Sequence, residues 1–526
     1  MSQRKVLIQS AFGRWPMLEF ELDIVQRELD QGSTVYFAFC RGGKDYCSAN
    51  NPKPEQKFEQ SKCIACKSRV KRGLQWLEDS NGKLIPLDYK SVNKIQEKRI
   101  SSLWQKILEQ DFPLEIKYLG LSTDEKRCWF YALSGLNTDL RSATVDLGLH
   151  RRRFGLMFVE ALTSHYSAEA HVQQLRPDYV YLYNARMPRY GPVVDILERT
   201  GTPFAVYEYP SVGETNYLLS PGFRPHDFAD FVAQNKKRFF SLPDADQHDF
   251  REIAKDWLNK RSKRILDGRQ KKLIGVALDS IESRKMPIDW DVHAPSRTVA
   301  VFPSSQYEFV NVQSHARSMA LEQASVIQKA LVSFPDVHFF VRMHPAQPDT
   351  DQPFVSDVLA LQALPNCTVL PPSSGIDSYE LGANCDAVIT FGSTIGVELA
   401  FQGKFVIECG SHKYSLFGAT TPVFSDAQLQ NSLEKCLAAA PKSSADGQLR
   451  DAAVNAVAAD LSVGRKPIYI ERSSGSRPKM VRRGKTYVVE AYGVAKFVSN
   501  LSSPGQVLRS AVDPWYRRAR RLFSNQ

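Results

Sequence analysis

The sequence predicts an α/β protein with two Rossmann-like domains that face each other across a cleft. In both halves of the chain, short apolar runs alternate with helical patterns, which is typical of parallel sheets. The 526 residues are also too many for a single hydrophobic core, so two large domains are expected. A hydrophobic content of 43% fits a folded globular protein.

The N-terminal half begins with the pattern of a strand, a loop, a helix and a second strand. Four apolar runs are expected to form its strands: residues 5–10, 34–39, 178–183 and 203–207. Helical patterns occupy 17–29 and 193–199. Polar residues follow the last two strands, namely Asn184 with Arg186, and Glu208. Ligands of doubly wound sheets bind beyond the carboxyl ends of the strands, so these side chains are candidate site residues.

The C-terminal half shows a second α/β series that begins with a strand at 298–302. It continues through segments with strand or helix patterns at 317–334, 337–343, 387–391, 394–402 and 405–408. We therefore expect an N-terminal domain at 1–255, a charged and helical connection at 256–296, a second domain at 297–440, and a helical, basic extension at 441–526.

The strongest motif lies where the predicted strand 387–391 meets a helix, at the turn Gly392-Ser393-Thr394. Glycine lets the backbone approach a ligand, and hydroxyl groups and free helix N–H groups can donate to phosphate. Glu398 lies one turn into the helix on the face of Thr394, where its carboxylate can accept ribose hydroxyls. Helix capping explains Ser393 and Thr394, but it does not explain the glycine and the carboxylate beside them.

Two further strand ends carry polar residues that can contact a nucleotide: Arg342, His344, Ser304, Ser305 and Glu308. Pro345 biases His344 away from helical geometry and keeps it at the end of its strand. Taken alone, a His-Pro pair is common and the serine segment reads as an ordinary turn. Both gain weight because they belong to the same α/β series as Gly392.

Four of the nine cysteines lie in one polar, lysine-rich segment and are spaced C-x6-C-x15-C-x2-C: Cys40, Cys47, Cys63 and Cys66. In a cytoplasmic protein this cluster favours a structural zinc site over disulfides. Iron–sulfur ligation and free thiols stay open as alternatives. No catalytic metal is expected, because the D-x-D patterns at 244–246 and 289–291 follow no convincing strand.

The charge of the chain is concentrated at its end. Residues 465–526 contain 14 basic and three acidic residues. Their formal net charge of 14 − 3 = +11 equals the net charge of the whole chain. The segment 514–523 mixes arginines with aromatic residues, as interfacial membrane segments do, although a solvated helix end is an equal reading. The sequence shows no signal peptide and no spanning segment, so we expect a cytoplasmic protein. The basic end of the chain then favours contact with the inner membrane face. No nucleic-acid-binding motif accompanies it, so we expect no nucleic-acid partner.

Together these motifs resemble those of bacterial capsule and surface-polysaccharide biosynthesis proteins with the GT-B glycosyltransferase fold. The segments that carry the resemblance are 302–309, 342–345, 392–398 and 403–404, and in the N-terminal half the four-cysteine loop, 184–186, 207–208 and 225–227. The His-Pro pair with Ser393 and Thr394 is similar to the nucleotide site of Kdo- and sialic-acid-type transferases and of teichoic-acid glycerophosphotransferases. The resemblance covers most of residues 1–415, and Ala346 departs from it where asparagine is common.

The resemblance implies a glycosyltransferase that moves a sugar from a CMP-, CDP- or UDP-linked donor to a glycan or glycolipid acceptor by direct displacement. It places the donor on the second domain and the acceptor on the first. Glu208 is then the candidate base, while Asn184, Arg186 and His226 position the acceptor. An ion pair between Arg186 and Glu208 is the structural alternative. Two other functions stay open: a nucleotide-sugar 2-epimerase of the same fold, and a non-catalytic membrane-associated scaffold.

Overall fold

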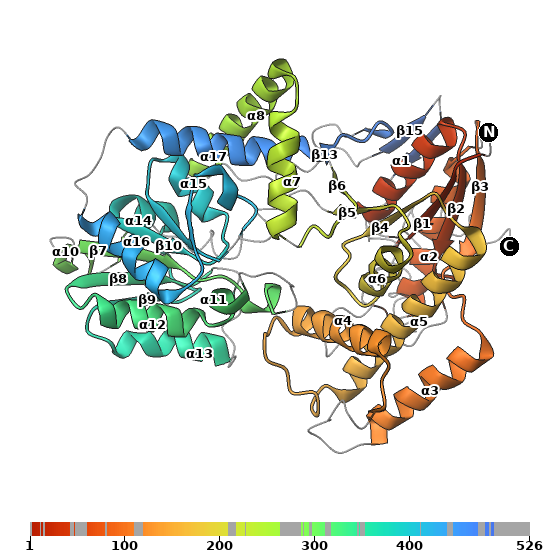
Figure 1. The fold of residues 1–526 in the computed structure, drawn as a ribbon, viewed down its shortest axis with the longest axis horizontal. Coiled ribbons are helices and arrows are strands. Elements are labelled where there is room, and N and C mark those ends of the chain that lie inside the picture. Colours follow the sequence, from red (N-terminus) through yellow and green to blue (C-terminus); the bar gives the residue numbers. More distant parts are fainter. Residues whose placement is uncertain are drawn as a thin grey trace, which may run out of the picture.

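The structure is a computed structural model that shows two α/β domains side by side (Figure 1). It describes residues 3–10, 12–13, 16–42, 47, 60–78, 81–109, 119–208, 217–226, 228–263, 286–287, 289–293, 297–310, 317–344, 347, 353–410, 412–438, 445–471, 479–482 and 485–488. The arginine-rich segment 514–523 lies outside these ranges.

The first domain is built on a seven-stranded sheet with the order β13-β6-β5-β4-β1-β2-β3. Its strands are β1 (Lys5–Gln9), β2 (Thr34–Phe39), β3 (Lys83–Asp88), β4 (Tyr179–Tyr183), β5 (Phe204–Glu208), β6 (Tyr217–Pro221) and β13 (Gly464–Arg465). Strands β1 to β5 pair in parallel, whereas β6 and β13 are antiparallel to their neighbours. Its helices are α1 (Met17–Asp30), α2 (Gln60–Trp76), α3 (Lys94–Glu109), α4 (Thr123–Leu140), α5 (Arg151–Leu175) and α6 (Gly191–Thr200).

The second domain has a six-stranded, fully parallel sheet with the order β12-β11-β10-β7-β8-β9. Its strands are β7 (Arg297–Phe302), β8 (Val337–Arg342), β9 (Cys367–Leu370), β10 (Ala387–Thr390), β11 (Val406–Cys409) and β12 (Thr421–Val423). The helices after β7 are α11 (Arg317–Leu321), α12 (Gln323–Ser333), α13 (Pro353–Ala360), α14 (Ser378–Asn384), α15 (Ile395–Phe401), α16 (Asp426–Ala438) and α17 (Ala445–Ser462), and α10 (Trp290–His293) precedes it.

Both sheets have the doubly wound order 3-2-1-4-5-6, so the predicted fold class is confirmed. In such sheets the direction of the chain reverses between the first and fourth strands. These are β1 and β4 in the first domain, and β7 and β10 in the second. Ligand sites are therefore expected at the carboxyl ends of these strand pairs.

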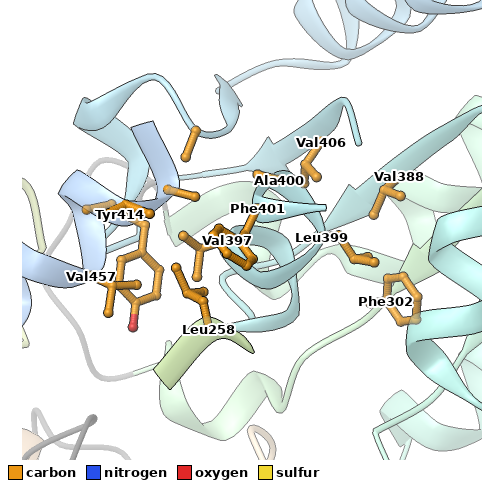
Figure 2. Packing of buried hydrophobic residues seen from close by; sticks show 14 of the residues in the cluster. Leu258, Phe302, Val388, Val397, Leu399, Ala400, Phe401, Val406, Tyr414 and Val457 are labelled. Carbon is orange, nitrogen blue, oxygen red and sulfur yellow. The ribbon is translucent and has the colours of Figure 1, made fainter. Parts of the chain in front are cut away.

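Strand β7 shows why the core segments read as continuous apolar runs. Val299 and Val301 pack into one core cluster, and Ala300 and Phe302 pack into another on the opposite face of the sheet. A strand covered on both faces needs apolar residues at every position. In the second of these clusters, Phe302 lies with residues of β10, α15 and two distant helices (Figure 2).

Those two helices change the domain limits that the sequence suggested. Leu258 of α8 (Asp244–Ser262) and Val457 of α17 lie together in the core of the second domain (Figure 2). The expected boundary at 255/256 thus falls inside α8, and α7 (Phe228–Phe240) also sends Phe239 into this core. Only the first part of the expected connection, 256–263, lies in or next to α8, where Gln247, Ala254 and Leu258 are buried and most charged residues are exposed. Residues 264–285 of the connection lie outside the described ranges.

After α17 the chain returns to the first domain. Strand β13 pairs with β6, and a small antiparallel sheet follows: β14 (Ile470–Glu471), β15 (Lys479–Arg482) and β16 (Lys485–Val488). The buried carboxylate of Asp23 in α1 accepts the N–H groups of Ile468 and Tyr469, and Met480 joins the core of the first domain. In its described part, the expected helical extension is therefore one helix followed by short strands that pack on the other domain, and residues 489–526 lie outside the described ranges. Among the described helices, none combines the length and apolar character that a membrane span requires.

Candidate active site

The four residues predicted for the acceptor side come together at the carboxyl edge of the first sheet. Asn184 follows β4, Glu208 ends β5, and His226 lies in the loop after β6. Asn184 Nδ2 donates to Glu208 Oε2 at 2.6 Å and lies 3.2 Å from His226 Nε2, which is 3.7 Å from Glu208 Oε2. Glu208 and His226 keep 14% and 28% of their side-chain surface exposed, so both can meet a ligand from solvent.

The turn that carries Asn184 is strained. Asn184 and Ala185 have φ angles of 62° and 63°, in the left-handed region that side chains other than glycine rarely adopt. Asparagine tolerates this region, but alanine has no polar group that would compensate the cost of about 1–3 kcal/mol. Arg224 Nη1 donates to Ala185 O at 3.4 Å, and Ala185 N–H donates to Tyr183 O at 2.7 Å. Such strain is typical of functional sites.

Arg186 follows this turn and links the two domains. Its Nη1 donates to the main-chain oxygen of Glu308 at 3.2 Å, and its Nη2 donates to Thr138 Oγ1 at 3.4 Å. Burial lowers the pKa of Arg186, and the negative charges of Glu308 and Glu208 oppose this shift. In turn, the protein around the Glu308 carboxyl raises its pKa, while Arg186 and His226 oppose that rise. The carboxyl edges of the two sheets therefore meet at this contact.

Two residues of this junction were not predicted from sequence. Arg141, at the end of α4, has a left-handed φ of 51° and acts electrostatically on Glu308 and Tyr307. Tyr307 belongs to the motif 302–309 but no role was assigned to it, and burial raises the pKa of its phenol. Nothing in the local sequence marks Arg141, because its neighbours at the junction are far away along the chain.

On the second domain, the main chain of the turn after β10 lies close to neighbouring side chains, as expected for a glycine. Gly392 has a φ of 78°, and a Cβ atom there would lie 3.0 Å from the Phe309 ring and 3.3 Å from the His412 ring. Thr394 is the N-cap of α15 but its side chain makes no capping hydrogen bond, so helix capping does not account for this threonine. Ser393 and Thr394 are half-buried beside Gly392.

Glu398 is a correction to the sequence prediction. The side chain is buried, its Oε1 accepts from Arg261 Nε at 2.7 Å, and its Oε2 accepts from the Tyr379 hydroxyl at 2.7 Å. Both carboxylate oxygens thus join α15 to α8 and α14, and the side chain is shielded from solvent. The prediction was wrong because Arg261, the ionic partner, lies 137 residues earlier in the chain.

Arg342 is likewise turned into the protein. Its guanidinium donates to the main-chain oxygens of Met343, Pro371 and Ser374, and it is 3% exposed. Burial lowers its pKa to about 10. The predicted contact of Arg342 with a nucleotide is therefore replaced by a role in holding the loop after β9. The next candidate, His344, is an exposed residue that follows β8. Partial shielding of its imidazole from water lowers the pKa of His344, and the positive charge of Arg342 adds to this shift.

The serine segment after β7 is held by side-chain amides. Gln323 Oε1 accepts from Ser304 N at 2.9 Å, and Gln323 Nε2 donates to Ser304 O at 3.1 Å. Ser305 Oγ donates to Gln347 Oε1 at 3.2 Å. Because Gln323 is fully buried, the loop is anchored and its half-buried serines stay at the carboxyl end of β7.

A buried polar cluster beside the Gly392 turn was also missed. Glu408 lies in β11, one residue before its end, and its Oε2 accepts from the hydroxyls of Ser415 and Thr420 at 2.8 and 2.7 Å. Burial raises the pKa of Glu408 to about 7 and lowers that of His412 to about 3, and the charge of Lys413 adds to the second shift. His412 Nδ1 lies 3.9 Å from Glu408 Oε1. A polar residue at the end of the predicted strand 405–408 was the available signal.

Comparisons with known proteins add only a general likeness. No protein-family model matches the chain. No curated protein matches it either. Among solved structures, a Thermosulfurimonas dismutans KpsC, described as a beta Kdo 2,4 transferase, is 12% identical, with a TM-score of 0.34 over 61% of this chain and 87% of that one. The calicheamicin glycosyltransferase CalG4 is 10% identical, with a TM-score of 0.26 and coverage of 88% and 96%.

A putative UDP-N-acetylglucosamine 2-epimerase from Listeria monocytogenes is also similar, at 10% identity, with a TM-score of 0.28 and coverage of 88% and 95%. Transferases and an epimerase thus stand side by side among the similar structures. At these identities and TM-scores, none of them carries an argument about activity or substrate. The chain is an α/β protein with two doubly wound domains whose predicted acceptor-side residues meet the second domain at Arg186 and Glu308.

Proposed function

We propose that this protein is a glycosyltransferase that moves a sugar from a nucleotide-linked donor to a surface-glycan or glycolipid acceptor. One observation carries the proposal. The cluster of Asn184, Glu208 and His226 lies at the ligand edge of the first sheet, and Arg186, two residues after Asn184, reaches the ligand edge of the second. A group-transfer enzyme with two substrates needs such a junction, because the reacting atoms must be held together between two binding surfaces.

Glu208 is the proposed general base. As the acceptor hydroxyl attacks the anomeric carbon, its proton passes to Glu208, the new C–O bond forms and the bond to the donor phosphate breaks. The amide of Asn184 donates to one carboxylate oxygen and orients the other toward the acceptor. The negative charge that develops on the leaving phosphate is stabilised by the guanidinium of Arg186 at the junction.

His226 is the alternative base, and its contacts argue for a supporting role. If Asn184 Nδ2 donates to both neighbours, His226 Nε2 is an acceptor, and its proton lies on the other ring nitrogen. The Nε2 lone pair is then already bonded. Glu208 therefore has the better-placed acceptor oxygen, while His226 positions the acceptor.

The donor is proposed to lie on the second domain, against Ser304, Ser305, His344 and the turn Gly392-Ser393-Thr394. The half-buried hydroxyls and the exposed imidazole occupy the carboxyl ends of three neighbouring strands, β7, β8 and β10. CMP, CDP and UDP are the proposed nucleotides. A lipid-linked or capsular acceptor at the inner membrane face agrees with the basic segment 465–526, and the proposed location is cytoplasmic.

Nucleotide-dependent thermal stabilisation tests the donor site. We expect CMP, CDP or UDP at millimolar concentration to raise the melting temperature, while GDP serves as a purine comparison. Absence of stabilisation by every nucleotide would overturn the proposal. An epimerase would show itself by converting a nucleotide sugar to its 2-epimer without an acceptor, and a scaffold would bind a nucleotide without turning over any donor.

A further inference from the structure

Three of the four clustered cysteines lie against two glycines, Gly13 and Gly42, at the carboxyl edge of the first sheet. Cys40 directly follows β2, and Cys47 comes seven residues later in the sequence. Cys63 and Cys66 lie one turn apart near the start of α2. The other five cysteines lie elsewhere, and four of them are buried. The structure places none of the nine, all of which it describes, in a disulfide bond.

Gly13, which follows β1 in the chain, contacts the sulfur atom of Cys66. Its N–H donates to Cys66 Sγ at 3.2 Å. A Cβ atom on residue 13 would lie 2.4 Å from the main-chain oxygen of Cys66, so no residue other than glycine allows this approach without movement of the backbone. The contact holds the Cys66 sulfur at the carboxyl end of β1.

Gly42 makes the corresponding contacts with two more sulfurs. Its N–H donates to Cys40 Sγ at 3.4 Å, and a Cβ atom on residue 42 would lie 3.2 Å from Cys63 Sγ. The φ of 86° also favours glycine at this position. Cys40 and Cys63 therefore both lie against Gly42.

The fourth sulfur belongs to the same neighbourhood. Cys47 and Cys40 both lie within electrostatic reach of the Cys66 thiol. Within the described residues, no group of three or more His, Cys, Asp or Glu side chains is already placed to hold a metal ion. Binding would therefore have to draw the four sulfurs closer together, as happens in structural sites whose ligand loops order with the metal.

We propose that Cys40, Cys47, Cys63 and Cys66 bind one structural Zn²⁺ ion as four thiolates. Zinc prefers tetrahedral sulfur ligands in closed structural sites, and the pair Cys63 and Cys66 has the spacing of a zinc-binding C-x2-C. Each thiol releases its proton on binding. The ion would tie the end of β2 and the start of α2 to the loop at Gly13, beside the strand pair β1 and β4 where the proposed acceptor site lies.

Metal analysis of the full-length protein, purified without added metal and dialysed, tests this site. We expect about one zinc per chain. The double variant Cys63→Ser/Cys66→Ser should lose it, whereas Cys436→Ser, at a half-buried cysteine outside the cluster, should keep it. If the double variant does not fold, titration of the wild-type protein with a mercurial reagent should release one zinc for about four thiols modified.

Three results would overturn the proposal: less than about a fifth of an equivalent of zinc in the wild-type protein, zinc retained in the double variant, or iron with a visible absorption band in place of zinc. The site stands apart from the proposed transferase activity. Zinc content is measured without nucleotide or acceptor, so a failure of either proposal leaves the other one intact.

Discussion

Arg186 Nη1, in the first domain, donates a hydrogen bond to the main-chain oxygen of Glu308 in the second, at 3.2 Å. The contact joins residues 122 positions apart in the chain and brings the ligand edges of the two sheets together. It also places a guanidinium whose pKa is lowered by burial next to the proposed base.

Replacement of the proposed base should remove catalysis while leaving donor binding intact. We expect Glu208→Gln to lower kcat roughly 100-fold to 10,000-fold, because glutamine keeps the shape but cannot accept the acceptor proton. Nucleotide-dependent stabilisation should not change. Glu252→Gln, on the exposed surface of α8, is the matched control. Full activity in Glu208→Gln together with loss in His226→Gln would assign the base to His226.

The strained turn should respond to the shape of residue 185. Ala185→Val is expected to destabilise the protein by roughly 1–3 kcal/mol, because a β-branched side chain is strongly disfavoured at a φ of 63° and the site is buried. Ala185→Gly removes the strain and should stay close to wild type in chemical denaturation. If valine and glycine gave equal stability, the left-handed geometry would be refuted.

The buried ion pair between Arg261 and Glu398 should govern stability and not nucleotide affinity. We expect Glu398→Ala to reduce the free energy of unfolding by about 3–5 kcal/mol, since it leaves a desolvated guanidinium without its partner. A double-mutant cycle with Arg261→Ala should show coupling, while CMP, CDP and UDP binding persists. Loss of nucleotide binding in a folded Glu398→Ala variant would return Glu398 to the ligand site.

Glu408 should make the protein less stable as the pH rises toward 7. Burial raises its pKa to about 7, so the folded state holds a proton that the unfolded chain has already released above about pH 4.5. Between these values the free energy of unfolding should fall by up to about 1.4 kcal/mol per pH unit for this group. His412, with a pKa lowered to about 3, acts in the opposite direction below about pH 6.5.

The isosteric variant Glu408→Gln separates these two contributions, because it removes the carboxyl proton and keeps His412. Urea unfolding measured from pH 4.5 to pH 7 should show a more positive slope of stability against pH in the variant than in the wild type. Parallel pH profiles for the two proteins would mean that Glu408 titrates normally in the folded state.

The positions of the candidate residues at strand ends could be predicted from the sequence. Asn184 and Glu208 in the first sheet and Ser304 in the second each lie at the end of an apolar run, and in a doubly wound sheet such positions lie at the carboxyl edge whatever the order of the strands. The apolar pattern of β7 is a local property, because a strand covered on both faces needs apolar residues throughout. The fold class followed from the same local patterns.

Contacts between residues far apart in the chain could not be predicted from these local patterns. The sequence of α15 shows a carboxylate on the ligand side of a helix, but only the packing of α8 brings Arg261 against it. In the same way, only the return of the chain after α17 shows that β13 completes the first sheet. Hydrophobic periodicity and strand-end polarity depend on neighbours along the chain, so the sequence by itself determined the two α/β domains and the candidate edge residues. Whether a polar side chain faces a ligand or a buried partner depends on which distant element packs against it, and this was decided by the tertiary structure alone.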